Sequence, residues 1–212
     1  MDKIILKNPN EVYDALKNDD TIKSWLKFIS KKYIPPESRI SLFYPCTTIK
    51  PFAKSQSYRQ LFKTFAKIPG HSELIHVYTI SEPFGIIPFE LGSKVPSYDC
   101  PGLFEWWCKQ NGEPFDKEYQ DKSIEILAKY TSKLLNKLHN SSKIALVRTY
   151  SSSLERRHDH THFRILKRAS ELASEQITFI PNKQIVKKII QNRGRYAWDR
   201  YGPAHPIVQE NF

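Results

Sequence analysis

The sequence contains few cysteines and no long apolar run. Its three cysteines, Cys46, Cys100 and Cys108, form no paired pattern, which fits a reducing compartment better than a disulfide-stabilised fold. No apolar stretch approaches the roughly 20 residues that span a bilayer. The segment from Met1 to Lys7 also lacks the apolar stretch of a signal peptide. We therefore expect a cytoplasmic protein that does not interact with a membrane.

Internal repeats, low-complexity tracts and Gly/Ser linkers are absent from the sequence as well. The 212 residues are 40% hydrophobic and include 12 Phe, 11 Tyr and 4 Trp, enough for a sizeable core and too apolar for disorder. This length suits one large domain. The sequence predicts a single α/β domain over residues 1–212, with N-terminal helices in 1–36, an α/β core in 37–181 and a basic C-terminal helix and tail in 182–212.

The charge of the chain is strongly positive and unevenly distributed. Lys and Arg number 33 against 22 Asp and Glu, a formal charge of +11. Residues 143–212 carry a net +7, and the longer segment 1–142 carries only +4. Chains this basic often bind polyanions, of which nucleic acid is the commonest in the cytoplasm. A merely solvated basic surface is the alternative, but the asymmetry favours a nucleic-acid partner.

Apolar periodicity predicts four strands separated by helices. Strands are expected at 40–44, 74–80, 144–147 and 177–180, and the longest helix at 116–138. Residues 81–102 hold so many Pro and Gly that an irregular loop is expected there. Strands joined through helices form right-handed crossovers. The sequence therefore predicts a three-layer α/β fold with a mainly parallel sheet of about four strands.

Functional residues of such a sheet lie beyond the carboxyl ends of its strands, here in the loops 45–57, 81–102 and 149–162. In the first loop, Cys46 directly follows a strand, and Lys50 and Lys54 supply positive charge. The free amides of a helix that begins near Ser57 also favour an anion. Such surroundings favour the reactive thiolate form of a cysteine. Cys46 is thus a candidate nucleophile, and a buried structural cysteine is the alternative.

The same loop resembles the signature of the archaeosine synthases, archaeal enzymes that act on a 7-deazaguanine base in tRNA. Their pattern is Pro-Cys, three residues, Lys-Pro-Tyr, two residues, Ser, two residues and His. This chain has Phe52 in place of the tyrosine and Tyr58 in place of the histidine, so it lacks a phenol and an imidazole at these positions. The other positions are kept, namely Pro45, Cys46, Lys50, Pro51 and Ser55.

Two later segments are similar to the same family. Glu82–Leu91 resembles its Ser-Pro-Leu-Gly-Val-Val-Pro-Arg-Glu-Leu stretch, and Tyr98–Pro101 resembles its Tyr-Asp-Ile-Pro. The resemblance covers roughly residues 40–150, the central domain of the family, which is similar in fold to uracil-DNA glycosylases. The full-length enzymes add an inactive transglycosylase-like domain and a terminal RNA-binding domain. We therefore expect this chain to be a short form with the core domain alone.

The resemblance implies a transferase that attaches free L-lysine to the nitrile of 7-cyano-7-deazaguanine in the D-arm of tRNA. A radical-SAM partner then cleaves the adduct to the amidine of archaeosine. This chain lacks the three-cysteine cluster that such a radical enzyme needs, so the partner is expected to be a separate protein. A noncatalytic tRNA-binding subunit of a modification complex, or a nucleobase glycosylase, are the alternatives.

Individual roles follow from the reaction of an amine with a nitrile, which needs a neutral amine and a proton donor for the nitrile nitrogen. Asp99 and Glu90 are expected to hold the ammonium group of lysine or accept its proton, and Lys50 or Tyr58 to polarise the nitrile. Cys46 either attacks the nitrile to give a thioimidate or leaves the attack to the amine. The resemblance adds Ser55 to the catalytic set. It implies substrate-binding roles for Pro45, Pro51, Phe52, Glu90 and Tyr98.

A histidine cluster, His158, His160 and His162, precedes the helix expected at 163–173. Alternate histidines can converge on a metal ion, but no carboxylate or cysteine set accompanies them in the sequence. Loop histidines that are solvated or touch RNA phosphate are therefore expected. The sequence predicts neither a metal ion nor a cofactor.

The tail after residue 182 alternates cations with aromatic residues. This mixture suits phosphate contacts combined with stacking on unpaired bases, although its aromatic side chains can instead pack onto the core. The candidate RNA-binding residues are Lys187, Lys188, Arg193, Arg195, Tyr196, Trp198 and Arg200.

Overall fold

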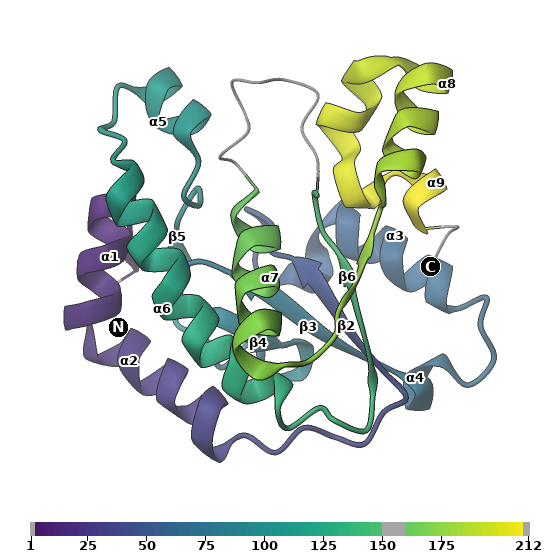
Figure 1. Ribbon diagram of the computed structural model, residues 1–212, viewed down its shortest axis with the longest axis horizontal. Helices are drawn as coiled ribbons and strands as arrows, with labels where there is room; N and C mark the ends of the chain where they lie inside the picture. Colours follow the sequence, from purple (N-terminus) through teal and green to yellow (C-terminus); the bar gives the residue numbers. More distant parts are fainter. Residues whose placement is uncertain (1–2, 150–159, 210–212) are drawn as a thin grey trace.

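The computed structural model describes residues 3–149 and 160–209, with residues 195–201 described by their backbone only. Its centre is a five-stranded sheet with the strand order β4-β3-β2-β6-β7 (Figure 1). The strands β2, β3, β6 and β7 are parallel, and β4 is antiparallel to β3. Their bounds are Ile40–Pro45 for β2, Ile75–Ser81 for β3, Gly85–Pro88 for β4, Ser142–Leu146 for β6 and Thr178–Ile180 for β7. The predicted α/β fold with a mainly parallel sheet is confirmed.

The fifth strand, β4, lies in the segment expected to be irregular, and that prediction was wrong for these four residues. The chain returns alongside β3 directly after a short turn, and this places Ile86 and Ile87 in the core, where they are almost fully buried. Gly85 begins the strand with a φ of 67°, a conformation that a side chain disfavours. Pro88 ends it at the edge of the sheet, where a missing N–H leaves no ladder bond unmade. A two-stranded parallel pair of β1 (Ile4–Ile5) and β5 (Tyr98–Asp99) was also not predicted.

Helices cover both faces of the sheet (Figure 1). On one face lie α6 (Lys117–Leu135) and α7 (Thr161–Ala173), with α1 (Pro9–Asn18) against α6 and α2 (Asp20–Lys27) following α1. On the other face lies α3 (Gln56–Phe65), beside the C-terminal segments. The remaining helical segments are η1 (Phe28–Lys32), η2 (Phe52–Lys54), α4 (His71–Leu74), η3 (Phe89–Leu91), α5 (Glu105–Asn111), α8 (Lys183–Tyr201), η5 (Gly202–Ala204) and α9 (Pro206–Gln209).

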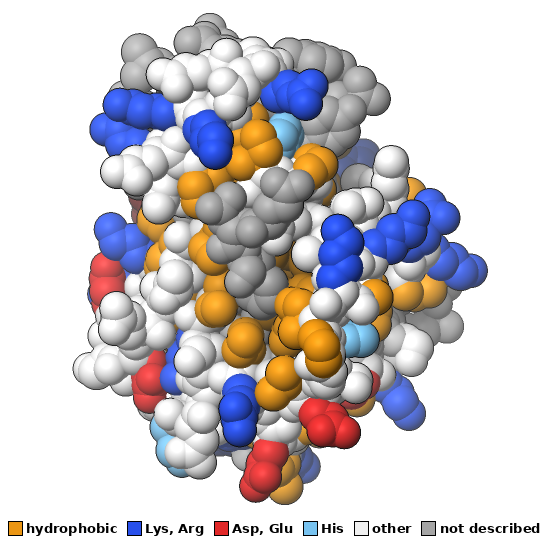
Figure 2. Space-filling view, turned by 90° about the vertical axis from the view of Figure 1, so that its right-hand side faces the viewer, with side chains coloured by type: hydrophobic (Ala, Val, Ile, Leu, Met, Phe, Trp, Pro, Cys, Tyr) orange, Lys and Arg blue, Asp and Glu red, His pale blue; other side chains and the backbone are white. Residues whose placement is uncertain are grey.

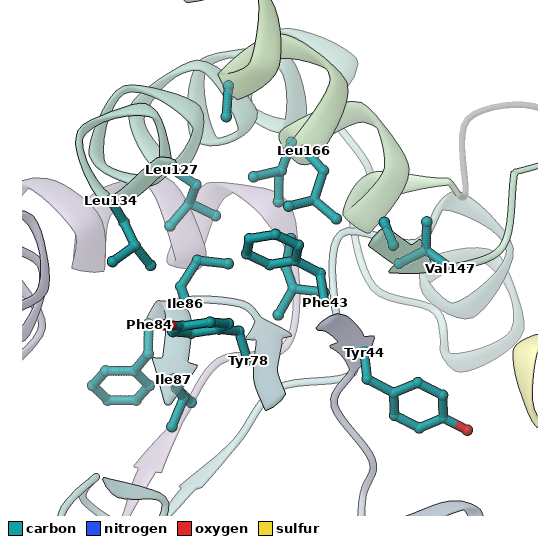
Figure 3. Packing of buried hydrophobic residues seen from close by; sticks show 14 of the residues in the cluster. Phe43, Tyr44, Tyr78, Phe84, Ile86, Ile87, Leu127, Leu134, Val147 and Leu166 are labelled. Atoms are coloured by element: carbon teal, nitrogen blue, oxygen red, sulfur yellow. The ribbon is translucent and has the colours of Figure 1, made fainter. Parts of the chain in front are cut away.

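Side chains of β2 alternate between the two layers, as expected for a strand covered on both faces. Phe43 points toward α6 and α7, where Leu127 and Leu166 lie above it, and Tyr44 points away from them (Figure 3). The ring of Phe43 stacks on that of Tyr78 in the neighbouring strand, with centroids 5.5 Å apart. The core is thus continuous through the sheet, which holds the strand ends in fixed positions.

Within the described part of the chain, no helix has the length and apolar character needed to cross a bilayer.

Candidate active site at the carboxyl edge of the sheet

The strands β2 and β3 and the segment that leads into α7 bring three polar side chains to one edge of the sheet. We call this the carboxyl edge, because the parallel strands end there. Cys46 directly follows β2, and its backbone N–H donates to the carbonyl of Ile80 at 2.9 Å, which fixes it beside β3. Glu82 directly follows β3, and His162 lies in the first turn of α7. These three polar side chains therefore meet at the edge where the sequence predicted a site.

Cys46, Glu82 and His162 form a compact group, which we call the edge cluster. The Nε2 atom of His162 lies 3.0 Å from Oε2 of Glu82 and 4.0 Å from Sγ of Cys46. The other carboxylate oxygen, Oε1, accepts a hydrogen bond from the hydroxyl of Thr161 at 2.7 Å. The three sulfur, oxygen and nitrogen atoms all lie within 4.8 Å of one another. A thiol, a carboxylate and an imidazole thus face a common point.

Burial sets the electrostatics of the edge cluster. The side chain of Glu82 is only 1% exposed, which would raise its pKa. The positive charge of His162 and the hydrogen bonds from His162 and Thr161 outweigh burial and lower it below the usual range. Burial alone would lower the pKa of His162, but the Glu82 carboxylate raises it to about 10. Without other ligands, the pair is a carboxylate and an imidazolium, the pairing that a buried charge requires.

The expectation that the histidines have no cysteine or carboxylate partner was wrong. His162 meets Glu82 and Cys46 across 80 and 116 positions of sequence. His160 does not belong to the edge cluster; it is buried, and burial together with the charge of Arg148 lowers its pKa to about 4. His158 lies outside the described residues. The sequence offered one signal for these residues, namely their position, because each belongs to a loop or to the start of a helix at the carboxyl edge.

A pocket of about 290 Å³ lies at the same edge, and we call it the edge pocket. Its wall is formed by Lys50–Phe52 from the loop after β2, by residues 92, 93 and 95–97 from the loop before β5, and by Tyr98 at the start of β5. The ammonium nitrogen of Lys50 lies 4.1 Å from the centre of the Tyr98 ring. The Tyr98 hydroxyl forms a hydrogen bond with the Ser81 hydroxyl at 2.6 Å, which fixes the pocket wall to the end of β3. Four predicted residues, Lys50, Pro51, Phe52 and Tyr98, therefore line one cavity.

The edge pocket and the edge cluster are close enough to interact electrostatically. Burial, followed by the charge of Glu82, raises the pKa of the Cys100 thiol well above its ordinary value. Cys46 and Lys50 also act on the same thiol. Cys100 directly follows β5, two residues after the pocket residue Tyr98.

Ser55 and Tyr58 shape the loop from within the core. Ser55 is buried, and its hydroxyl accepts from the backbone N–H of Tyr58 at 3.3 Å, which caps α3. Tyr58 is fully buried, stacks between Phe52 and Phe89, and hydrogen-bonds with Thr79. Both residues position the pocket wall, and their predicted catalytic roles stay predictions.

Asp99 and Glu90, which were expected together in one loop, lie in different places. Asp99 is exposed beside the pocket residue Tyr98, with Lys3 at 3.4 Å. Glu90 lies near the amino end of β3, because the antiparallel β4 carries the chain back, and there it accepts from Tyr33 at 2.8 Å and pairs with His76 at 3.2 Å. The structure does not bring Glu90 to the carboxyl edge. Pro45 ends β2 directly before Cys46.

The predicted RNA-binding residues lie in α8, at the side of the molecule opposite α1 (Figure 1). Lys187, Lys188 and Arg193 are exposed. Gly194 interrupts the helix with a φ of 76°. Figure 2 shows Lys and Arg side chains on both sides of an apolar strip on the face where the C-terminal helices lie. The side chains of four further candidates lie outside the described residues, namely Arg195, Tyr196, Trp198 and Arg200.

The mainly parallel sheet, with a buried carboxylate beside a half-buried thiol and imidazole at its carboxyl edge, defines an α/β protein with an enzyme-like site. Residues 22–176 match the model of a domain of unknown function, DUF5591. The chain belongs to this family.

Two curated relatives carry the same name. The chain is 27% identical over 100 residues to the archaeosine synthase subunit alpha of Thermoplasma acidophilum, covering 46% of this chain and 19% of the relative. It is 22% identical over 170 residues to that of Thermococcus kodakarensis, covering 79% of this chain and 26% of the relative. The predicted resemblance to archaeosine synthases is thus confirmed. The chain spans about a quarter or less of the length of these relatives.

Among solved structures, AF0587, a protein of unknown function, aligns with a TM-score of 0.49 and 16% identity, covering 75% of this chain and 43% of that one. The expected similarity to uracil-DNA glycosylases stays a prediction.

Proposed function

We propose that this chain acts in the archaeosine modification of tRNA, and that its edge pocket transfers L-lysine to the nitrile of 7-cyano-7-deazaguanine in tRNA. The relatives named archaeosine synthase subunit alpha support the pathway. One observation supports the site. Lys50–Phe52 and Tyr98, which belong to two separate segments that resemble the family, line a single pocket.

The size of the edge pocket suits a small substrate group. Its volume of about 290 Å³ lies at the lower end of the range of small-molecule sites, which is enough for one nucleobase or for the side chain of lysine. A base inside folded tRNA must leave its stack to reach such a pocket, as in other enzymes that modify bases. Phe52 and Tyr98 supply apolar walls, and Lys50 supplies a hydrogen-bond donor.

The reaction is an addition without a leaving group and without a change of oxidation state overall. The lysine nitrogen forms a bond to the nitrile carbon, one C≡N π bond breaks, and a proton moves from the amine to the former nitrile nitrogen. Lys50 is placed in the pocket wall, and its N–H groups can stabilise the negative charge that develops on that nitrogen. Asp99, next to the pocket, is our candidate for holding the substrate ammonium.

Two reaction routes are compatible with these changes in bonding. In the first, the amine attacks the nitrile carbon directly. In the second, Cys46 Sγ attacks first, giving a thioimidate, and the amine then displaces the thiol, which regains its proton. A separate radical-SAM protein would cleave the lysine adduct afterwards.

A second candidate function is that of a noncatalytic tRNA-binding subunit. The exposed cations of α8, Lys187, Lys188 and Arg193, favour it, because such contacts bind phosphate without chemistry.

Incubation with labelled L-lysine and tRNA bearing 7-cyano-7-deazaguanine tests the proposal. We expect label to become attached to this tRNA and not to tRNA with guanine at the same position. Tight tRNA binding without label would refute transfer and support the binding subunit. Release of the free base would refute it in favour of a glycosylase.

A further inference from the structure

We propose that Cys46, Glu82 and His162 bind one Zn²⁺ ion. This inference rests on the geometry of the edge cluster and does not depend on lysine transfer, because metal binding is measurable without tRNA.

The first argument is the way in which the three side chains converge. In a nucleophile–histidine–carboxylate triad, the imidazole contacts the nucleophile through one nitrogen and the carboxylate through the other. Here the sulfur of Cys46 and the carboxylate of Glu82 both approach the same nitrogen, Nε2 of His162, at 4.0 and 3.0 Å. The group is therefore not arranged as a relay. Its three donor atoms, all within 4.8 Å of one another, surround a point instead.

The second argument is that a tetrahedral zinc ion fits these separations. Zinc binds His nitrogen at about 2.0–2.1 Å, carboxylate oxygen at about 2.0–2.2 Å and Cys sulfur at about 2.3 Å. At the tetrahedral angle, nitrogen and oxygen ligands lie roughly 3.3 Å apart, and nitrogen and sulfur ligands roughly 3.6 Å apart. The observed separations of 3.0 and 4.0 Å differ from these values by a few tenths of an ångström. The oxygen–sulfur separation is within 4.8 Å, so side-chain movements of about 1 Å bring the three atoms to zinc distances.

The donor set also selects the metal. Calcium and magnesium are bound by oxygen, whereas sulfur, nitrogen and oxygen together suit zinc. The carboxylate of Glu82 is 1% exposed, and a charge buried this deeply needs a positive partner. Without a metal ion the imidazolium of His162 is that partner, and a divalent cation bound to both side chains would supply the positive charge in its place.

Groups around the edge cluster hold its members in place, as is typical of metal sites. The Thr161 hydroxyl donates to Oε1 of Glu82 at 2.7 Å and leaves Oε2 directed at His162. The backbone N–H of Cys46 is bonded to Ile80.

Three protein ligands leave one coordination position open, which is the arrangement of catalytic zinc sites. Among the side chains that the structure describes, no fourth His, Cys, Asp or Glu joins the three-residue group. Resting here on the proposed function, we assign the open position to the nitrile nitrogen, whose lone pair zinc would accept as a Lewis acid. Cys46 is then a ligand, which selects direct attack by the amine over the thioimidate route.

Metal analysis of the untagged protein tests this proposal. After dialysis we expect about one zinc per chain in the wild type, and strong loss of zinc in Cys46→Ser and His162→Ala. Cys100→Ser and His139→Ala are matched controls, because Cys100 lies near the edge cluster but outside it, and His139 is exposed. Both controls should keep zinc. Circular dichroism shows whether each variant is folded.

Cobalt substitution identifies a thiolate ligand directly, and the wild-type spectrum does not depend on how well the ligand variants fold. Wild-type protein titrated with Co²⁺ should show a thiolate-to-cobalt charge-transfer band, which Cys100→Ser keeps and Cys46→Ser loses. Thr161→Val retains all three ligands, and we expect about 10–100-fold weaker zinc affinity.

Several outcomes would overturn the proposal: wild-type protein that binds neither zinc nor cobalt, a cobalt complex without the thiolate band, or zinc retained in Cys46→Ser. Zinc lost from Cys100→Ser would overturn the open three-ligand site. Zinc binding without lysine transfer would refute the proposed function alone, and transfer by a protein that binds no metal would refute the zinc site alone.

Discussion

The Thr161 hydroxyl, in the first turn of α7, donates a hydrogen bond to Oε1 of the Glu82 carboxylate, and removing this bond is a stringent test of the edge cluster. Thr161 is fully buried, and its Oγ1 lies 2.7 Å from Oε1. Valine has nearly the same shape, so Thr161→Val removes the bond without creating a cavity. Hydrogen bonds to charged groups contribute about 1.5–3 kcal/mol. We expect the free energy of unfolding to fall by about 1.5–3 kcal/mol.

Urea denaturation measures this loss, with excess chelator present so that metal binding does not contribute. The slope of the free energy of unfolding against urea concentration should stay unchanged, since the surface exposed on unfolding is the same. Thr149→Val is the matched comparison, because the buried Thr149 hydroxyl donates to the neutral carbonyl of Pro181, also at 2.7 Å. Its expected loss is about 0.5–1.5 kcal/mol. Thr178→Val, on the exposed side of β7, should change stability by less than about 0.5 kcal/mol.

Two results would refute this reasoning. If Thr161→Val loses no more stability than Thr178→Val, α7 does not anchor Glu82. If it loses only as much as Thr149→Val, the acceptor is not a carboxylate with its full charge.

Three further predictions concern residues inside and outside the edge site. Glu90→Gln should lower the free energy of unfolding by about 1 kcal/mol and leave lysine transfer unchanged, as measured by denaturation and by label incorporation. Replacing Lys187, Lys188 and Arg193 with Ala should weaken tRNA binding. The slope of the logarithm of the binding constant against the logarithm of the salt concentration should become less steep by about 0.7–0.9 per lost phosphate contact, as measured by binding titrations over a salt series. Cys46→Ala should abolish transfer, and denaturing mass spectrometry of the wild type during turnover should show no protein–RNA adduct.

Matched measurements decide each of these predictions. Ala substitutions at Lys31 and Lys32, which are exposed in η1, should leave the salt dependence of tRNA binding intact. If the substitutions in η1 weaken tRNA binding as much as those in α8, then α8 is not a specific contact for tRNA. Transfer impaired by Glu90→Gln would place the active site at the amino end of the sheet. A trapped adduct would favour the thioimidate route and contradict the role of Cys46 as a metal ligand.

The sequence predicted the sheet well where the local signal was strong. Apolar runs bounded by Pro and polar residues located β2, β3, β6 and β7, and helical periodicity located α6. The strand β4 was missed because it has only four residues, between Gly85 and Pro88. The strands β1 and β5 have two residues each, too few for any periodicity to appear.

The site was predictable only in part, because its residues meet through the fold. Cys46, Lys50 and Tyr98 were predicted from their motifs and lie at the carboxyl edge. Glu82 was not singled out, and His162 was considered only together with His158 and His160, since the contact of His162 with Glu82 joins positions 80 residues apart. Knowledge of the strand order would have suggested them, because both lie next to the edge where β2 and β3 end.

The nucleoside composition of tRNA after reaction tests the central claim most directly. tRNA bearing 7-cyano-7-deazaguanine is incubated with the protein and lysine, digested, and analysed by mass spectrometry. We predict that the 7-cyano-7-deazaguanosine gains the full mass of lysine with no atom lost. This product should fall by about 10²–10³-fold in Lys50→Ala and persist in Lys54→Ala, whose lysine is exposed outside the pocket. An unchanged nucleoside, or equal product from both variants, would contradict lysine transfer in the edge pocket.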